Sequence, residues 1–363
     1  MDRWDELLCQ PNVAPSPRVA VCSGTNVLIT GAGGYIGSAL AKAIATSNPQ
    51  LLILIDHTEE NLYRIHNQLE ACFPATTHVP ILGDIGDSTL LNEIFHTYRP
   101  HTVFHAAAYK HVPLLEANLF PAMGNNILGT LVLAQTCLQY EAARLVMIST
   151  DKAVNPASVM GTSKRIAELV LLSLTTAKTR MSAVRFGNVF GSTGSVVPRF
   201  LRQIAEHGPV TVTHRDASRY FLTLPEAIEL ILAAASLDEN GSILIPRMPP
   251  PINILDLANR LVASRYAESK QPIEIIFTGL RPGEKLTEEI VSSRESVEPT
   301  LEPLLYRAFT PQLPEDILHA ALRKIALGVQ ERNFAVLFDT VSRVVPEYCP
   351  SESVLGLLKA ELA

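Results

Sequence analysis

The chain of 363 residues is 47% hydrophobic, which is enough to bury a large core in one domain or in two closely packed ones. Its net charge of -6 argues against a nucleic-acid partner, and its apolar runs are too short to span a membrane. Five scattered cysteines without a Cys-x-x-Cys pair favour neither a disulfide framework nor a zinc site. The charged N-terminal residues are unlike a secretory leader, so the cytoplasm is the expected compartment.

Strand and helix patterns alternate from residue 26 to about residue 150. Short continuous apolar runs predict strands at residues 27–30, 51–55, 79–82, 102–105 and 144–149. Helical spacing of apolar residues predicts helices between them, at residues 38–47, 59–72, 90–98 and 129–140. Apolar strands that do not alternate with polar residues indicate a parallel sheet covered on both faces. The expected fold class is α/β, a doubly wound parallel sheet with a smaller C-terminal substrate lobe.

The alternation ends near residue 188, which divides the chain into segments. We expect an N-terminal arm at residues 1–25, a Rossmann domain that binds NAD at 26–188, a substrate lobe at 189–300 and a helical segment at 301–363 that packs on the core. Isolated helices are predicted in the lobe at residues 225–236 and 254–262.

A glycine-rich turn follows the first predicted strand and opens a helix. Glycines let backbone N–H groups approach a pyrophosphate, which the helix N-terminus attracts. Asp56 closes the next strand about 19 residues beyond the turn and suits the adenosine ribose hydroxyls, which favours NAD over NADP. The alternative is a packing turn in which Asp56 caps a helix. The residues assigned to the cofactor here are Gly31, Gly34, Tyr35, Ile36 and Gly37.

The ends of the third and fourth strands supply further cofactor contacts. Asp84 can accept a hydrogen bond from the adenine amino group while Ile85 packs on the ring, although an ordinary turn is the alternative. Small residues at the end of the fourth strand let a cofactor lie against the backbone, with close packing as the alternative; they are Ala106, Ala107 and Ala108.

No metal site is assigned. His101 and His105 have the spacing His-x-x-x-His, but the residues between them are strand-like. On a strand this spacing separates the two side chains by roughly 13 Å, which is too far for them to share one metal ion.

Several motifs in a fixed order resemble those of one protein family. They are Thr30-Gly-x-x-Gly-x-x-Gly37, His105-Ala-Ala-Ala-Tyr-Lys-His-Val-Pro113, Ser149-Thr-Asp-Lys-Ala-Val-Asn-Pro156, Arg185-Phe-Gly-Asn-Val189, Arg219-Tyr-Phe221 and Arg281-Pro-Gly-Glu-Lys285. Together they resemble the extended short-chain dehydrogenase/reductase superfamily and, within it, the polysaccharide-biosynthesis branch of UDP-N-acetylglucosamine 4,6-dehydratases. The resemblance covers roughly residues 5–350 and implies NAD, a UDP-sugar substrate and a homo-oligomer. Larger family members carry membrane helices ahead of this unit, and we expect the freestanding form.

By this resemblance, the segment after the fifth strand carries out a dehydration. Such an enzyme moves hydride from sugar C4 to NAD, removes the C5 proton, protonates the departing C6 hydroxyl and returns the hydride to C6. Thr150 is expected to hydrogen-bond the 4-hydroxyl, Asp151 to be the acid at the C6 oxygen and Lys152 the base at C5. Lys152 must be neutral to act, and we expect burial and the nearby Lys164 to lower its pKa. Adjacent residues of a strand point to opposite faces of the sheet, so Asp151 and Lys152 can both reach the sugar only if the backbone turns after Thr150.

Two residues of the following helix complete the expected catalytic set. Lys164 is expected to hold the nicotinamide ribose. The superfamily's catalytic tyrosine is replaced by Met160, which cannot transfer a proton. Either Thr150 relays that proton with a water molecule, or the oxidation step is absent. Methionine here occurs in the family branch that retains the C5 configuration, which favours a retaining enzyme.

Polar residues elsewhere are assigned to the substrate. Guanidinium forks suit a diphosphate, and Glu284 matches the family's contact to the nucleotide ribose. An epimerase acting at C4 or C5, or a non-catalytic NAD-binding protein, are the alternative functions, although a 4-epimerase needs no Asp-Lys pair. The assigned residues are Lys110, His111, Arg185, Asn188, Ser195, Val196, Arg219, Arg281 and Glu284.

Overall fold

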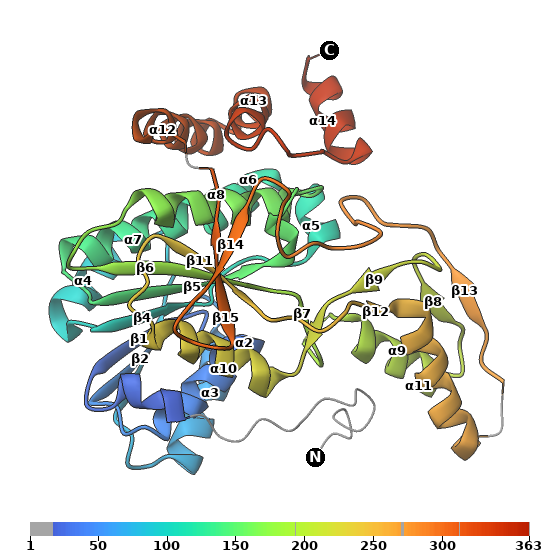
Figure 1. Cartoon of the computed structure of the whole chain (residues 1–363), viewed down its shortest axis with the longest axis horizontal. Helices are drawn as coiled ribbons and strands as arrows, with labels where there is room; N and C mark the ends of the chain where they lie inside the picture. Colours follow the sequence, from blue (N-terminus) through green and yellow to red (C-terminus); the bar gives the residue numbers. More distant parts are fainter. Residues whose placement is uncertain (1–16, 193, 270–271, 312, 363) are drawn as a thin grey trace.

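A nine-stranded sheet forms the centre of the computed structural model, which describes residues 17–192, 194–269, 272–311 and 313–362 (Figure 1). The strand order is β14-β15-β11-β6-β5-β4-β1-β2-β3. Neighbouring strands from β3 to β11 are parallel, whereas β15 and β14 are antiparallel additions. The bounds are β1 (Asn26–Thr30), β2 (Leu51–Asp56), β3 (His78–Leu82), β4 (Thr102–His105), β5 (Arg144–Thr150), β6 (Arg180–Phe186), β11 (Ser242–Pro246), β14 (Ser296–Pro299) and β15 (Leu305–Phe309).

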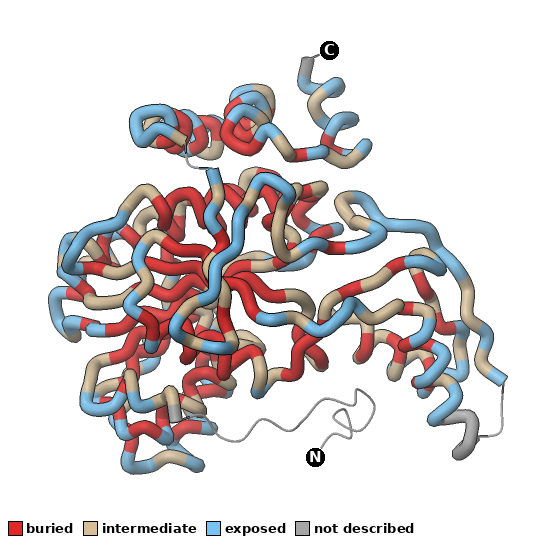
Figure 2. The backbone as a smooth tube through the Cα atoms, viewed as in Figure 1, coloured by how far each residue is buried: buried red, intermediate tan, exposed pale blue. Residues whose placement is uncertain are grey.

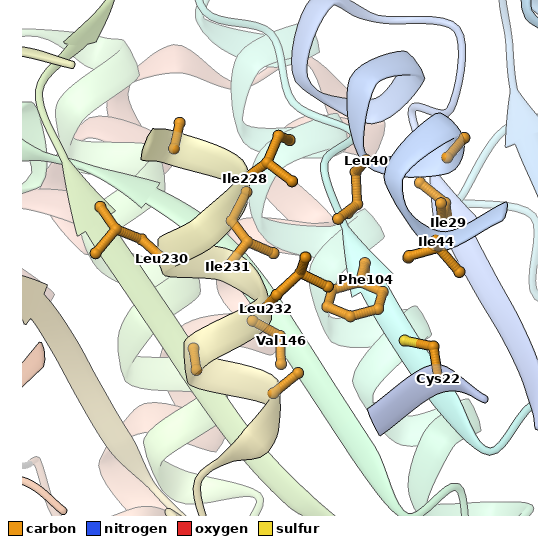
Figure 3. Close-up of a cluster of buried hydrophobic side chains, with 14 of the residues drawn as sticks. Cys22, Ile29, Leu40, Ile44, Phe104, Val146, Ile228, Leu230, Ile231 and Leu232 are labelled. Carbon is orange, nitrogen blue, oxygen red and sulfur yellow. The ribbon is translucent and has the colours of Figure 1, made fainter. Parts of the chain in front are cut away.

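Helices cover both faces of this sheet. On one face lie α2 (Tyr35–Ala45), α3 (Glu59–Cys72) and α10 (Leu224–Ser236), and on the other lie α4 (Ser88–Tyr98), α7 (Thr130–Gln139) and α8 (Val159–Ser173). Figure 3 shows Leu40 of α2 and Leu232 of α10 directed at Phe104 in the sheet. Figure 2 shows that the central strands are buried along their length. The predicted α/β fold with a doubly wound, largely parallel sheet is therefore confirmed.

A further helical layer covers the outer side of α8. Its members share one apolar cluster with α8, so every residue of α8 from Val159 to Leu172 is buried. The layer consists of α5 (Val112–Glu116), α6 (Leu119–Met123), the π-helix η2 (Gly124–Gly129), α12 (Glu315–Glu331), α13 (Phe334–Val344) and α14 (Glu352–Leu362). Among the described helices, none is long and apolar enough to cross a membrane.

A smaller lobe extends from one end of the sheet (Figure 1). Its own apolar core includes Phe200, Val210, Phe221 and Leu257. The short strands β7 (Asn188–Val189) and β10 (Phe221–Leu222) pair at its base. Its other elements are α9 (Val196–Ala205), β8 (Val210–Val212), β9 (Ser218–Arg219), β12 (Ile252–Asn253), α11 (Ile254–Ser269) and β13 (Ile275–Phe277).

The segment boundaries differ from those predicted. Residues 224–246, which hold α10 and β11, leave the predicted lobe and return to the sheet, because α10 is buried from Ala227 to Ala235 and needs a large apolar surface against which to pack. The strands β14 and β15 extend the sheet edge, so the C-terminal part is not purely helical. Residues 1–16 of the predicted arm lie outside the described residues, whereas residues 17–22 form the 3₁₀-helix η1 (Pro17–Cys22), which packs against α10.

Candidate active site

A cleft of about 790 Å³ lies at the carboxyl ends of the central strands and is closed on its other side by the lobe. The strands β2 and β4 lie on opposite sides of β1, so the strand order reverses next to β1. Open α/β sheets bind ligands at such a reversal. Most of the predicted site residues line this cleft. They are Gly31, Gly34, Tyr35, Ile36, Gly37, Ala106, Ala108, Lys110, His111, Thr150, Lys152, Met160, Lys164, Asn188, Ser195, Val196, Arg219, Arg281 and Glu284.

The glycine turn forms a cradle at one end of the cleft. A Cβ atom on Gly31, whose φ is +66°, would stand 2.7 Å from the Ala107 nitrogen, and one on Gly37 would stand 2.1 Å from the Gly31 oxygen. At the N-terminus of α2 the capping position is Gly34, which offers no side-chain cap to the first N–H groups. The N–H groups of a helix N-terminus attract phosphate, so the turn fits a dinucleotide.

Four of the residues predicted to bind the cofactor do not line the cleft itself. Asp56 is buried beneath the glycine turn, where its carboxylate accepts from the backbone N–H groups of Gly33 and Thr58, both at 2.9 Å. Asp84 accepts a hydrogen bond from the backbone N–H of Gly86 at 2.7 Å. Ile85 lies against Gly129, and the backbone of Ala107 lies against Gly31.

The predicted turn after Thr150 is present. There β5 ends and the 3₁₀-helix η3 (Asp151–Ala153) begins, so successive side chains no longer alternate between the faces of the sheet. Thr150 Oγ1 donates to Asp151 Oδ1 at 2.9 Å, and Lys152 Nζ donates to the same oxygen at 2.9 Å. The Asp151 side chain is fully buried and lies outside the lining of the cleft. Direct contact between Asp151 and the C6 oxygen is therefore not what the structure favours.

The pKa values of the two lysines of the site are shifted in opposite directions. Burial would lower the pKa of Lys152, but Asp151 and Glu288 outweigh burial, so the net direction is upward and the expected lowering is wrong. Burial lowers the pKa of Lys164 to about 8, against a smaller opposing effect of Glu168. Lys152 is therefore a cation held between carboxylates, and Lys164 is the lysine whose charge titrates near neutrality.

The structure places Arg185 outside the cleft, which corrects its assignment to the diphosphate. Its guanidinium donates to Glu168 at 2.7 and 2.8 Å and to Glu295 at 2.8 and 2.9 Å. The side chain is fully buried beside a separate cavity of about 120 Å³. Since two carboxylates compensate its desolvation, Arg185 connects α8 to the segment before β14 instead of binding substrate.

Arg219 and Asn188 line the cleft but are already engaged by protein groups. Arg219 donates to the carbonyl oxygens of Ser218, Lys285 and Leu286 at 2.7 to 3.0 Å, so it braces the segment that carries Arg281 and Glu284. Asn188 Oδ1 accepts from Lys152 Nζ at 3.1 Å.

Two charged residues of the cleft were missed by sequence reasoning. Arg199 lies in the first turn of α9, and burial together with Arg281 lowers its pKa. Glu288 is buried within 3.9 Å of Lys152 Nζ. Arg199 follows the predicted substrate residue Ser195 by four residues, about one helical turn, and this spacing could have been used to predict it. No local sequence pattern marks Glu288.

His105 has a structural role. It is buried between the hydroxyls of Thr30 and Thr130, at 2.8 and 2.9 Å, and burial lowers its pKa to about 3. Among the described residues, no group of three or more His, Cys, Asp or Glu side chains is arranged to hold a metal ion.

Comparison with known proteins identifies relatives along most of the chain. Residues 27–310 match the family described as polysaccharide biosynthesis protein. The capsular polysaccharide biosynthesis protein CapD of Staphylococcus aureus is 45% identical over 77% of this chain and 47% of that protein, so the chain spans about half of its length. A UDP-N-acetylglucosamine 4,6-dehydratase (inverting) of Campylobacter jejuni is 29% identical over 93% and 98% of the two chains. A UDP-glucose 4-epimerase of Rickettsia bellii is 33% identical over 74% and 78%.

Solved structures share the fold. Pen from Bacillus thuringiensis has a TM-score of 0.74 and 29% identity, covering 81% of this chain and 92% of that chain. A double mutant of DesIV, a dTDP-glucose 4,6-dehydratase of Streptomyces venezuelae solved with NAD bound, has a TM-score of 0.63 and 20% identity, covering 73% of this chain and 87% of that chain.

Proposed function

The chain belongs to the polysaccharide biosynthesis protein family, and from this membership we propose that it is a nucleotide-sugar 4,6-dehydratase acting on UDP-N-acetylglucosamine or a close UDP-hexosamine. The observation that carries the proposal is the hydrogen-bonded row Thr150, Asp151 and Lys152 at the end of β5, two members of which face the cleft. A hydroxyl, a carboxylate and an amine in contact supply the proton transfers that dehydration needs.

NAD is the cofactor that the cradle fits. Gly31, Gly34 and Gly37 would hold its pyrophosphate at the N-terminus of α2, Asp56 stands behind this turn, and Lys164 would reach the nicotinamide ribose. When bound, NAD supplies the group that accepts hydride from sugar C4 and returns it to C6. The NAD-bound DesIV structure is consistent with a dinucleotide in this fold.

Thr150 and Asp151 supply the proton path that a tyrosine would otherwise provide. A proton leaving the sugar 4-hydroxyl passes to the Thr150 oxygen, whose own proton moves to the Asp151 carboxylate 2.9 Å away. The proton arrives at Asp151 Oδ1, the oxygen that also accepts from Lys152 Nζ, while Asp151 Oδ2 has no hydrogen-bond partner among the described residues. The same proton returns through Thr150 to the departing 6-hydroxyl. The 4-hydroxyl proton thus leaves in the water molecule, and Asp151 ends as it began.

Lys152 is the base at C5 in this scheme. Its amine removes the C5 proton, and the resulting ammonium later delivers a proton to C5 from the same face of the sugar, which would retain the C5 configuration. Met160 is buried and faces the cleft, where its thioether forms an apolar wall that takes no part in proton transfer.

Incubation with UDP-N-acetylglucosamine in deuterated water, followed by NMR, tests the proposal. A 4,6-dehydratase yields a 6-deoxy-4-keto sugar with a new methyl signal and deuterium at C5. A 4-epimerase, which the 33% identical Rickettsia protein makes the second candidate, yields a sugar that keeps its 6-hydroxymethyl group and its C5 proton. Absence of any change with UDP-hexosamines, from protein loaded with NAD, would rule out the proposed function.

A further inference from the structure

Glu288 is a buried carboxylate surrounded by cations at the catalytic turn. Its Oε1 atom lies 3.9 Å from Lys152 Nζ and 3.9 Å from Arg219 Nε, and its Oε2 atom lies 3.8 Å from Lys285 Nζ. The side chain lines the cleft although only 3% of the residue is exposed. These distances are too long for direct hydrogen bonds, so the carboxylate interacts with these three cations through charge.

The hydrogen-bonding capacity of Glu288 is unused. Within the described ranges, no donor reaches either oxygen of its side chain at hydrogen-bond distance, and Oε2 is buried without a partner. A buried carboxylate normally accepts several hydrogen bonds, because leaving its oxygens unpaired is costly. The three neighbouring cations are themselves bonded elsewhere. Lys285 donates to Val154 O at 2.6 Å, Arg219 donates to backbone carbonyls, and Lys152 donates to Asp151.

The proposed function leaves one proton unaccounted for. Lys152 has to be a neutral amine to remove the C5 proton, yet its Nζ atom stands between the Asp151 and Glu288 carboxylates. Asp151 cannot take the Lys152 proton, because in the proposed path it is already occupied by the proton from the 4-hydroxyl. A second acceptor within reach of Nζ is required.

We propose that Glu288 is this acceptor: it takes a proton from the Lys152 ammonium before the C5 proton is removed, and it returns that proton at the end of the cycle. The inference rests on the proposed function of the same cleft. A movement of about 1 Å would bring Oε1 from 3.9 Å to hydrogen-bond distance of Nζ.

The transfers balance. An ammonium and a carboxylate become an amine and a carboxylic acid, and the amine then takes the C5 proton and becomes an ammonium again. After elimination the ammonium gives one of its three protons to C5, and in deuterated water its other two positions carry solvent deuterium, so C5 becomes labelled. The resulting amine recovers its original proton from Glu288, so the enzyme ends in its starting state without any other reactant.

The charges around Lys152 support an internal transfer in place of loss to solvent. Asp151 and Glu288 attract its proton, Arg219 repels it, and Asn188 accepts one hydrogen bond from it at 3.1 Å. Protonation of Asp151 removes one of the two attractive charges. The remaining negative charge is then Glu288, whose oxygens are free to receive the proton.

Single-turnover kinetics of Glu288→Gln test the inference, because glutamine keeps the size of the side chain and removes its titration. With UDP-N-acetylglucosamine and NAD-loaded enzyme in deuterated water, we expect reduction of the bound nicotinamide at near the wild-type rate. Deuterium incorporation at C5 should fall by about 10²- to 10⁴-fold at neutral pH. The loss should shrink as pH rises, since solvent can then deprotonate Lys152. The wild type should vary little over the same range.

A purely electrostatic role gives the opposite result. If Glu288 only holds the proton on Lys152, Glu288→Gln would make the amine easier to deprotonate, and C5 exchange as fast as or faster than wild type at every pH would overturn the inference. The matched control is Glu289→Gln, because Glu289 is the exposed neighbour whose carboxylate accepts from Asn155 at 2.6 Å. This control should behave as wild type.

A second variant, Glu288→Asp, tests the inference if Glu288→Gln does not fold. Glu288→Asp keeps a titratable acceptor at a longer distance, so C5 exchange should be slowed without gaining the pH dependence. Equal slowing of nicotinamide reduction and C5 exchange in Glu288→Asp would indicate a structural role and overturn the inference. A wild-type protein that neither reduces its cofactor nor exchanges C5 would instead refute the proposed function, which distinguishes the two failures.

Discussion

Two residues of one cleft, Lys152 and Lys164, show how neighbouring charges decide the charge of a lysine. Lys164 is buried and Lys152 is half-buried, and loss of water by itself disfavours the ammonium. Two carboxylates surround Lys152 and raise its pKa in spite of burial. Among the residues that the structure describes, Glu168 alone opposes the effect of burial on Lys164, whose pKa falls to about 8. A sequence shows that a lysine is present, but its protonation depends on carboxylates that the fold brings to it.

In the proposed mechanism Thr150 belongs to the proton path and Met160 to the apolar wall, and substitutions at the two positions distinguish these roles. Thr150→Val removes the hydroxyl that donates to Asp151 and should slow nicotinamide reduction by about 10²- to 10⁴-fold. Met160→Leu conserves volume at a buried position and should keep most of the activity. Stopped-flow absorbance of the bound nicotinamide measures both. Wild-type reduction in Thr150→Val would refute the relay, and a large loss in a folded Met160→Leu would mean that the thioether position acts directly.

At the scale of elements, α8 and η3 hold the proposed catalytic groups against each other. A Cβ atom on Gly161 would lie 2.1 Å from the Lys152 carbonyl oxygen, so the first turn of α8 contacts η3 at a distance only glycine permits. Because α8 is buried between the sheet and the helical layer in which α5, α6 and η2 contact it, the positions of Met160 and Lys164 are fixed by packing on both sides.

The N-terminus of α9 is the element we expect to hold the substrate diphosphate. Ser195 Oγ is buried there without a partner among the described residues, and Arg199 and Arg281 line the same cleft, close enough for their charges to interact. Arg199→Met should raise the Kd for UDP by about 10- to 150-fold, which corresponds to about 1.5 to 3 kcal/mol for hydrogen bonds to a charged group. Titration calorimetry measures this change. Arg202→Met, on the next turn and outside the cleft, is the control; equal affinities for UDP in both variants would contradict the assignment.

At the scale of the whole molecule, one arginine joins segments that are distant in sequence. Arg18 of η1 donates to Glu302, between β14 and β15, with two bonds of 2.8 Å, and it also pairs with Glu229 of α10. It therefore connects the start of the described chain to both segments that return to the sheet from beyond the lobe.

Arg18→Met should lower the free energy of unfolding by about 1.5 to 3 kcal/mol, because two partly buried carboxylates lose their partner. Urea unfolding should show a lower midpoint with an unchanged slope. Arg64→Met removes an exposed pair with Glu60 on α3 and should cost only about 0.3 to 0.5 kcal/mol. Similar losses in the two variants would show that Arg18 does not link these segments.

The sequence by itself determined the first five strands of the sheet, the glycine turn and the turn after β5. Each of these is a local pattern: apolar runs of strand length, glycines at a strand-to-helix junction, and three consecutive residues after β5. Because secondary structure follows from such short-range periodicity, the predicted strands and most helices agree with the structure to within a few residues.

Only the tertiary structure decided which charged residues share a site. Arg185 pairs with Glu295, 110 residues away, and thereby leaves the substrate set, whereas Glu288 joins Lys152 only after the segment beyond β13 folds over η3. The return of α10 and β11 to the sheet likewise depends on an apolar surface assembled from several strands. Ion pairs and burial act between neighbours in space, so their partners cannot be found from spacing along the chain.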